Sequence, residues 1–195
     1  MDRLCKSSCV SAPEQYRLNL NPGVCVQFCP SPYFADNSTF YCVDRCPNLP
    51  SIMYSFEPTR TCVLNCPPPY YSHYPDNICR LDCPDGFFAQ DSNRSCVRTC
   101  LSPYFADDST ERCVLRCPDS PIYFGHNLVC VDRCPDDTYA DNSTRLCSPT
   151  CPTQPVTFAD NSTNKCVASC PSTPNYYADR RLMKCVFNCS GGQFN

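Results

Sequence analysis

In this chain of 195 residues, cysteine is the residue type whose number and spacing most clearly indicate a chemical role. The sequence holds 22 cysteines, which form eleven Cys-x-x-x-Cys pairs. The pairs begin at Cys5, Cys25, Cys42, Cys62, Cys79, Cys96, Cys113, Cys130, Cys147, Cys166 and Cys185. From Cys62 to Cys147 each step is seventeen residues, and the other steps are seventeen, nineteen or twenty. An even cysteine count at regular spacing predicts a tandem array on a disulfide framework, in an oxidising compartment that is secreted or on the cell surface.

Two local disulfide schemes are compatible with this spacing, because cysteine positions alone do not determine connectivity. The first joins the second cysteine of one pair to the first of the next, as in Cys29–Cys42 and Cys134–Cys147. The second joins the two cysteines within each pair. We favour the first, because each bridge then closes a loop of about a dozen residues and contributes about 3 kcal/mol in the chain-entropy model. It leaves Cys5 and Cys189 without partners within residues 1–195, as expected for a segment cut from a longer array. It bridges Cys9, Cys25, Cys29, Cys42, Cys46, Cys62, Cys66, Cys79, Cys83, Cys96, Cys100, Cys113, Cys117, Cys130, Cys134, Cys147, Cys151, Cys166, Cys170 and Cys185.

N-linked glycosylation is the strongest other chemical signal. Asn37, Asn142 and Asn161 each begin an Asn-Ser-Thr acceptor sequence at the same position of three repeats. Asn93 begins Asn-Arg-Ser two residues later in its own turn. Asn188 begins Asn-Cys-Ser, a weaker acceptor because its cysteine is expected to be bridged. These five asparagines are the predicted glycosylation sites.

Catalytic and metal chemistry find little support in the residue pattern. His73 and His126 are the only histidines, and we expect both to be surface residues of turns. The Cys-x-x-x-Cys spacing differs from the Cys-x-x-Cys of zinc ribbons and thioredoxin-like sites. Calcium at Asp36, Asp141 and Asp160 is conceivable in terms of oxygen ligands, but no turn supplies enough carboxylates, which favours plain Asx turns. We therefore expect no enzyme activity, no catalytic or metal residues and no cofactor.

The repeat itself reads as a strand, a turn and a returning strand. Its clearest copy runs from Cys130 to Cys147, and the general form is Cys-Val-x-x-Cys-Pro, a spacer, an aromatic pair, Ala-Asp-Asn-Ser-Thr, two residues and the next cysteine. In an extended stretch the two aromatic side chains point to opposite faces, so one should cover a disulfide and a neighbouring Val. The small Ala suits a close approach, and Asp-Asn-Ser-Thr is turn chemistry. Cys46 to Cys62 inserts three residues, and Cys117 to Cys130 alters the turn, for which we predict a bulge.

Composition agrees with a small disulfide-rich tandem repeat, expected to be an elongated rod of stacked strand-turn-strand bows, irregular or β with little helix. The 21 prolines would break any long helix, and no stretch has helical periodicity. A formal net charge of −3 without a basic stripe gives nucleic-acid binding no electrostatic footing. No apolar run is long enough to span a bilayer.

We expect residues 1–195 to be a single tandem array of about ten repeats of 17–20 residues. The first residues have no apolar signal-peptide region, and the last residues stop inside a repeat. Both observations suggest a segment cut at both ends from a longer protein. The competing interpretation is a cytosolic start at Met1 with reduced thiols, for which 22 cysteines at this spacing have no evident role.

The run Cys-Val-x-x-Cys-Pro-x-x-Tyr, followed by another Cys-Val-x-x-Cys, resembles the single-disulfide modules of furin-like and growth-factor-receptor cysteine-rich domains. The Asp-Asn-Ser-Thr form is similar to repeat proteins predicted on the surfaces of ciliates and other protists. The resemblance covers nearly the whole chain and implies stacked disulfide bows in an extracellular protein. It implies no kinase, ligand or protease.

The expected function is that of an extracellular structural glycoprotein in a surface coat or fibril. The expected partners are N-linked glycans and further copies of the chain, because repeats without a polar cap and with open strand edges favour head-to-tail assembly. The alternative is the cysteine-rich stalk or ligand-binding ectodomain of a receptor or adhesin. An exceptional patch of exposed aromatic side chains in one repeat, rather than the same ones in all repeats, would favour that alternative.

Overall fold

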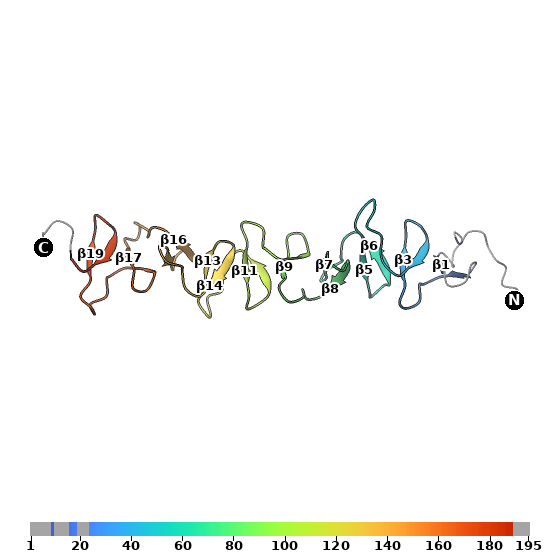
Figure 1. Cartoon of the computed structure of the whole chain (residues 1–195), viewed down its shortest axis with the longest axis horizontal. Coiled ribbons are helices and arrows are strands. Elements are labelled where there is room, and N and C mark those ends of the chain that lie inside the picture. Colours follow the sequence, from blue (N-terminus) through green and yellow to red (C-terminus); the bar gives the residue numbers. More distant parts are fainter. Residues whose placement is uncertain (1–8, 10–15, 19–23, 189–195) are drawn as a thin grey trace. The chain divides into compact units, whose positions relative to one another are not determined.

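The structure is a computed structural model that describes Cys9, residues 16–18 and residues 24–188. All regular secondary structure in this part is β-strand, and none of it is a helix able to cross a membrane. The chain divides into two compact units, Met1–Arg98 and Thr99–Asn195 (Figure 1). Unit 1 contains β1 (Tyr16–Leu18), β2 (Val24–Val26), β3 (Phe34–Asp36), β4 (Tyr41–Val43), β5 (Tyr54–Phe56), β6 (Thr61–Val63), β7 (Tyr71–His73), β8 (Ile78–Arg80), β9 (Phe88–Gln90) and β10 (Ser95–Val97). Unit 2 contains β11 (Phe105–Asp107), β12 (Arg112–Val114), β13 (Phe124–His126), β14 (Val129–Val131), β15 (Tyr139–Asp141), β16 (Leu146–Ser148), β17 (Phe158–Asp160), β18 (Lys165–Val167), β19 (Tyr177–Asp179) and β20 (Lys184–Val186).

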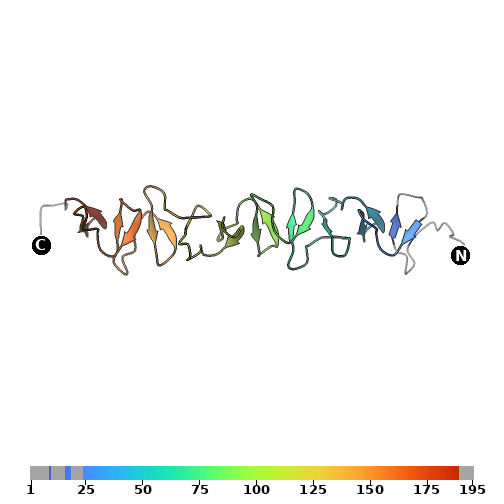
Figure 2. The same ribbon diagram turned by 90° about the horizontal axis from the view of Figure 1, so that it is seen from below.

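Each repeat is one antiparallel hairpin of two three-residue strands, β3 with β4, β5 with β6, and so on within each unit (Figure 2). The central residue of the first strand pairs with the first cysteine of the next Cys-x-x-x-Cys, as Ala35 does with Cys42. That central residue is small in most repeats, as the sequence indicated, and Ala35 is buried. The disulfide-rich tandem repeat predicted from the sequence is therefore the observed fold.

Ten disulfides join the second cysteine of one pair to the first cysteine of the next, from Cys9–Cys25 to Cys170–Cys185. This is the first of the two schemes considered above. Each bridge spans 13 to 16 residues and closes the base of one hairpin. Cys5 and Cys189 lie outside the described residues.

The segment after each Cys-Pro returns the chain to the hairpin. The carbonyl of Pro30 accepts a hydrogen bond from the Tyr33 amide at 2.8 Å, and Pro67 with Tyr70 repeats this at 2.9 Å. Proline suits this position because its ring sets φ and its missing N–H is not needed there. The result places the second aromatic of each pair at the start of the first strand.

Successive hairpins within each unit are joined by parallel pairing of the first strand with the second strand of the next hairpin. Ala35 of β3 pairs with Thr61 of β6, and Ala140 of β15 pairs with Lys165 of β18. The amide of Ala35 donates to the carbonyl of Arg60 at 2.8 Å, and the amide of Ala140 donates to Asn164 at 2.8 Å. We call this bond and the side chains around it the repeat junction.

The core of each unit alternates aromatic rings with disulfides. Tyr33 packs against the Cys29–Cys42 bridge of its own hairpin, whereas Phe34 packs against Cys46 and Cys62 of the next hairpin. Tyr139 contacts Cys151 and Cys166 in the same way. The two rings of an aromatic pair therefore face different bridges, as the extended backbone predicted. Each repeat buries little apolar surface alone and depends on its neighbour for a core.

Two sequence expectations were wrong. The hairpin between Cys117 and Cys130 has no bulge: Phe124, Gly125 and His126 pair in continuous register with β14. Its turn shortens to the two residues Asn127 and Leu128, both with positive φ, and its leading loop lengthens by the same amount and gains an Asp119–Ile122 bridge. A two-residue turn of this kind needs left-handed backbone at both positions. Because the leading loop gains as many residues as the turn loses, the two cysteines of this bridge remain 13 positions apart, as in most other repeats.

The histidines are also placed differently from the prediction. His73 ends β7 and is buried, and His126 ends β13 and is half-buried. The third position of the first strand is also buried in other hairpins, where it holds Asp36 or Gln90. Each turn therefore begins at the residue after the histidine, whereas we expected the turn to include the histidine.

Candidate functional site

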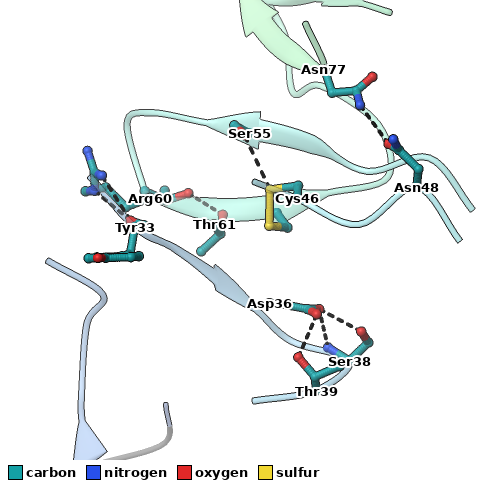
Figure 3. Close-up of a disulfide and its surroundings, with 12 residues drawn as sticks. Tyr33, Asp36, Ser38, Thr39, Cys46, Asn48, Ser55, Arg60, Thr61 and Asn77 are labelled. Atoms are coloured by element: carbon teal, nitrogen blue, oxygen red, sulfur yellow. Dashed lines mark hydrogen bonds between the residues drawn. A yellow bond between two sulfur atoms is a disulfide. The ribbon is translucent and has the colours of Figure 1, made fainter. Parts of the chain in front are cut away.

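The turns that carry the acceptor asparagines contain several side-chain hydrogen bonds within four residues. We call the four residues between the strands of a hairpin the sequon turn where Asn37, Asn142 or Asn161 begins it. Asp36, which precedes Asn37, is only 2% exposed. Its Oδ1 accepts hydrogen bonds from the Ser38 amide (2.9 Å) and hydroxyl (2.7 Å), and its Oδ2 accepts one from the Thr39 hydroxyl (2.6 Å) (Figure 3). This is the Asx turn that the sequence predicted, with Asp as the capping residue.

The same carboxylate arrangement recurs in unit 2. Asp141 binds Ser143 and Thr144, and Asp160 binds Ser162 and Thr163, all at 2.6–3.0 Å. Burial alone would raise the pKa of Asp160, but the hydrogen bonds from Thr163 and Ser162 outweigh it and hold that pKa below its usual value. The carboxylate is therefore ionised and serves the turn. A calcium ion would have to displace these donors, and no group of three His, Cys, Asp or Glu side chains in the described residues could hold a metal.

The acceptor asparagines themselves are accessible. Asn37, Asn142 and Asn161 are exposed at the first position of their turns, and so are Asn93 and Asn188. Asn93 differs because it lies one residue before the left-handed Arg94, and its Oδ1 accepts from the Ser95 hydroxyl at 2.7 Å. The structure thus places the three Asn-Ser-Thr sites in equivalent turns and Asn93 in a different backbone setting.

A tyrosine of the preceding repeat reaches two of these asparagines. The Tyr139 hydroxyl donates to Asn161 Oδ1 at 2.6 Å, and the Tyr16 hydroxyl donates to Asn37 Oδ1 at 2.5 Å. We call this hydrogen bond the tyrosine clamp. The turn after β9 has Asp91 at the equivalent position, and the Tyr71 hydroxyl donates to its carboxylate. Sequence analysis missed this contact because its partners lie 20 to 22 residues apart in different repeats.

The last residue of each described turn has left-handed backbone, immediately before the returning strand. The residues are Phe40, Arg60, Asn77, Arg94, Glu111, Leu128, Arg145, Asn164 and Met183, with φ of 51–65°. None of them is glycine, although glycine adopts this conformation at least cost. Side-chain contacts explain why arginine occupies some of these left-handed positions. Arg60 donates from Nε and Nη2 to the Tyr33 carbonyl of the preceding repeat, at 3.1 and 3.0 Å (Figure 3). Its guanidinium also stacks on the Phe34 ring, 4.9 Å from the ring centroid.

His73 belongs to a polar network in unit 1. Its Nδ1 lies 2.7 Å from Asp76 Oδ1, and its ring packs edge-on against Phe87 at 4.6 Å. Asp76 also binds the Arg80 guanidinium. Burial tends to raise the pKa of Asp76, but Arg80 and His73 together lower it below its ordinary value. These contacts take the place of the serine and threonine donors that bind Asp36, Asp107, Asp141 and Asp160, and they explain how this hairpin closes without the Asp-Asn-Ser-Thr sequence.

Grooves of about 420–470 Å³ recur at equivalent positions beside Tyr54, Phe105 and Phe158. The groove beside Phe105, in unit 2, was not anticipated from the sequence. It has a volume of about 450 Å³ and is lined chiefly by Phe105, Leu115, Arg116, Leu128 and Leu146. Gly125 lies beneath it: a Cβ there would come within 2.6 Å of the Phe105 ring and 2.9 Å of Leu146. The equivalent residues elsewhere are mostly alanine, so the ring leans over this one position because the methyl group is missing.

No protein-family model, curated protein or solved structure matches this chain. Its character is therefore read from its own residues: tandem disulfide-closed hairpins, joined within each unit by a repeated junction and carrying exposed acceptor asparagines.

Proposed function

We propose that this chain is part of an extracellular structural glycoprotein, built from disulfide-stapled repeats and belonging to a surface coat or fibril. The observation that supports this most directly is the repeat junction. The same amide-to-carbonyl hydrogen bond joins hairpins at Ala35–Arg60 and Ser55–Asn77 in unit 1, and at Gly125–Arg145, Ala140–Asn164 and Ala159–Met183 in unit 2, at 2.8–2.9 Å. A fold that adds one identical contact per repeat can be lengthened without redesign.

The chemistry of the repeats favours the same role. Stability rests on ten disulfides and small aromatic clusters rather than on one large core, which suits an oxidising exterior. Asn37, Asn142 and Asn161 carry N-linked glycans in this proposal, and Asn93 and Asn188 are secondary sites. Glycans on the turns keep the flanks soluble, while the open edges of the hairpins associate with further copies of the chain. The likeness to growth-factor-receptor cysteine-rich modules extends in this proposal to module type alone.

The test is imaging of the native full-length protein by negative-stain electron microscopy, combined with site-resolved mass spectrometry of the non-reduced material. We expect fibres or a continuous coat, the Cys134–Cys147 bridge and sugar on Asn37, Asn142 and Asn161. Isolated single molecules at high concentration would refute the fibril role. Unmodified asparagine at all three sites would refute the glycoprotein role.

The alternative is a ligand-binding stalk or ectodomain, and the groove beside Gly125 is the observation that favours it. Grooves of similar volume lie at the equivalent positions beside Tyr54 and Phe158, but the groove beside Gly125 is lined by three leucine side chains and the exposed Arg116. A structural array does not require this local enrichment of leucine in one groove. Loss of partner binding by Leu115→Ser, with binding retained by the matched exposed variant Leu81→Ser, would move the assignment to this alternative.

A further inference from the structure

The three equivalent sequon turns differ in one atom supplied by the preceding repeat. In the hairpin that precedes each acceptor turn, the first strand begins with an aromatic residue. This residue is Tyr16 for Asn37, Tyr139 for Asn161 and Phe124 for Asn142. Tyr139 and Phe124 are both buried, at 3% and 2% exposure, in matching clusters with a disulfide of the next hairpin. Only the tyrosines carry a hydroxyl that can reach the asparagine.

The direction of this hydrogen bond is compatible with a glycan. In the structure the hydroxyl donates to Oδ1 of the asparagine. Attachment of N-acetylglucosamine substitutes Nδ2 and leaves Oδ1 as an acceptor. The Tyr71–Asp91 contact supports the same direction, because an ionised aspartate can only accept. The clamp therefore survives glycosylation.

We infer that the tyrosine clamp holds the glycosylated side chains of Asn37 and Asn161 in one orientation across the repeat junction, whereas a glycan on Asn142 is free to rotate. This inference rests on the proposed glycosylation and deepens it. The hydroxyl comes from one repeat and the glycan from the next. A clamped sugar is thus tied to both hairpins and shields the junction between them.

The clamp also protects the linkage chemically. Peptide N-glycanase hydrolyses the bond between Cγ and Nδ2: water adds to the side-chain carbonyl, the glycosylamine leaves, and the asparagine becomes aspartate. The enzyme must reach the Cγ–Oδ1 carbonyl, whose oxygen accepts the hydrogen bond from the tyrosine hydroxyl at Asn37 and Asn161. On the folded protein we therefore expect release from Asn142 to be about fivefold faster than from Asn161, the factor equivalent to a hydrogen bond of about 1 kcal/mol.

The experiment uses the whole chain secreted from a eukaryotic host, with release at each site followed by mass spectrometry of the Asn-to-Asp conversion. Tyr139→Phe should raise the Asn161 rate to that of Asn142 and leave Asn37 unchanged. Phe124→Tyr should lower the Asn142 rate by a similar factor. Each variant exchanges a single hydroxyl inside a cluster that already accepts the other residue, so both should fold. After reduction and denaturation the three sites should react alike.

The possible failures are distinct. Sugar present at all three sites, with equal release rates in the folded wild-type protein and no response to either variant, would overturn the clamp and leave the glycoprotein proposal intact. Absence of sugar at all three sites would overturn both. A slower Asn142 site in Phe124→Tyr, together with a faster Asn161 site in Tyr139→Phe, would establish that the hydroxyl is responsible.

Discussion

Replacing Gly125 by alanine separates what the sequence pattern implies from what the packing allows. Six repeats have alanine at the equivalent position, namely Ala35, Ala89, Ala106, Ala140, Ala159 and Ala178. A consensus argument would therefore treat Gly125→Ala as neutral or stabilising. In the structure the new Cβ would lie 2.6 and 2.7 Å from two atoms of the Phe105 ring and 2.9 Å from Leu146 Cδ2.

The expected magnitude follows from two opposing terms. Overpacking a filled contact costs about 1–3 kcal/mol, because the ring and the leucine must both shift. Gly→Ala at a compatible backbone position returns about 0.4–1 kcal/mol by restricting the unfolded chain. The backbone of Gly125 is in a strand and has no left-handed φ, so this gain applies in full. We expect a net destabilisation of about 1–2 kcal/mol at the junction formed by the Gly125 amide and the Arg145 carbonyl.

Native-state hydrogen exchange of the residue-125 amide is the appropriate assay, because it reports the opening of this junction. The matched control is Ser55→Ala, which leaves a Cβ at the equivalent position of β5 and removes only the 3.4 Å hydrogen bond from the Ser55 hydroxyl to Cys46 Sγ. It should change the protection of the residue-55 amide by less than about 1 kcal/mol. In a Phe105→Ala background, Gly125→Ala should cost less, since the ring is gone and only Leu146 Cδ2 remains within 3 Å of the new Cβ. Protection equal to or greater than that of the wild type in the single variant would refute this account of the packing.

Three further predictions concern the turns. Arg60→Met should lower amide protection at its junction by about 2 kcal/mol, because it removes two charged hydrogen bonds to a carbonyl and a cation–π contact. Arg45→Met, at an exposed site, should not lower it. Equal effects of the two variants would contradict the role given to the Arg60 guanidinium. Glu111→Gly should stabilise the chain by about 0.5–1 kcal/mol in thermal unfolding, because it relieves a φ of 54°, while Asp108→Gly in the same turn should not stabilise it. The lowered pKa of Asp160 means that its stabilisation is complete above the unfolded value of 3.8 and is lost as the pH falls through the lower folded value. Acid titration followed by circular dichroism should therefore show a loss below about pH 4 that Asp160→Asn reduces; an unchanged acid transition in the variant would count against the carboxylate.

The repeat architecture was predictable from sequence because its signals are local. The spacing of cysteines such as Cys29 and Cys42 made closure of each loop the economical pairing, and the structure has that pairing. Asp36, Ser38 and Thr39 lie within four residues, so the Asx turn was predictable from residue type. Pairs and turns of this length depend on short-range geometry that every repeat shares.

The remaining features depend on contacts between repeats, which a local sequence pattern does not predict. The turn signals around His73 and Phe124 misplaced a strand end and suggested a bulge, because the register is decided by the pairing of whole hairpins. The tyrosine clamp joins residues 20 to 22 positions apart, and its absence at Asn142 follows from one missing hydroxyl at Phe124. Sequence by itself determined the repeat unit, the composition of its turns and where the acceptor asparagines lie, and it favoured the disulfide pairing without deciding it. Only the tertiary structure decided which side chains of one repeat reach the next, because the stacking of hairpins sets that distance and no spacing along the chain encodes it.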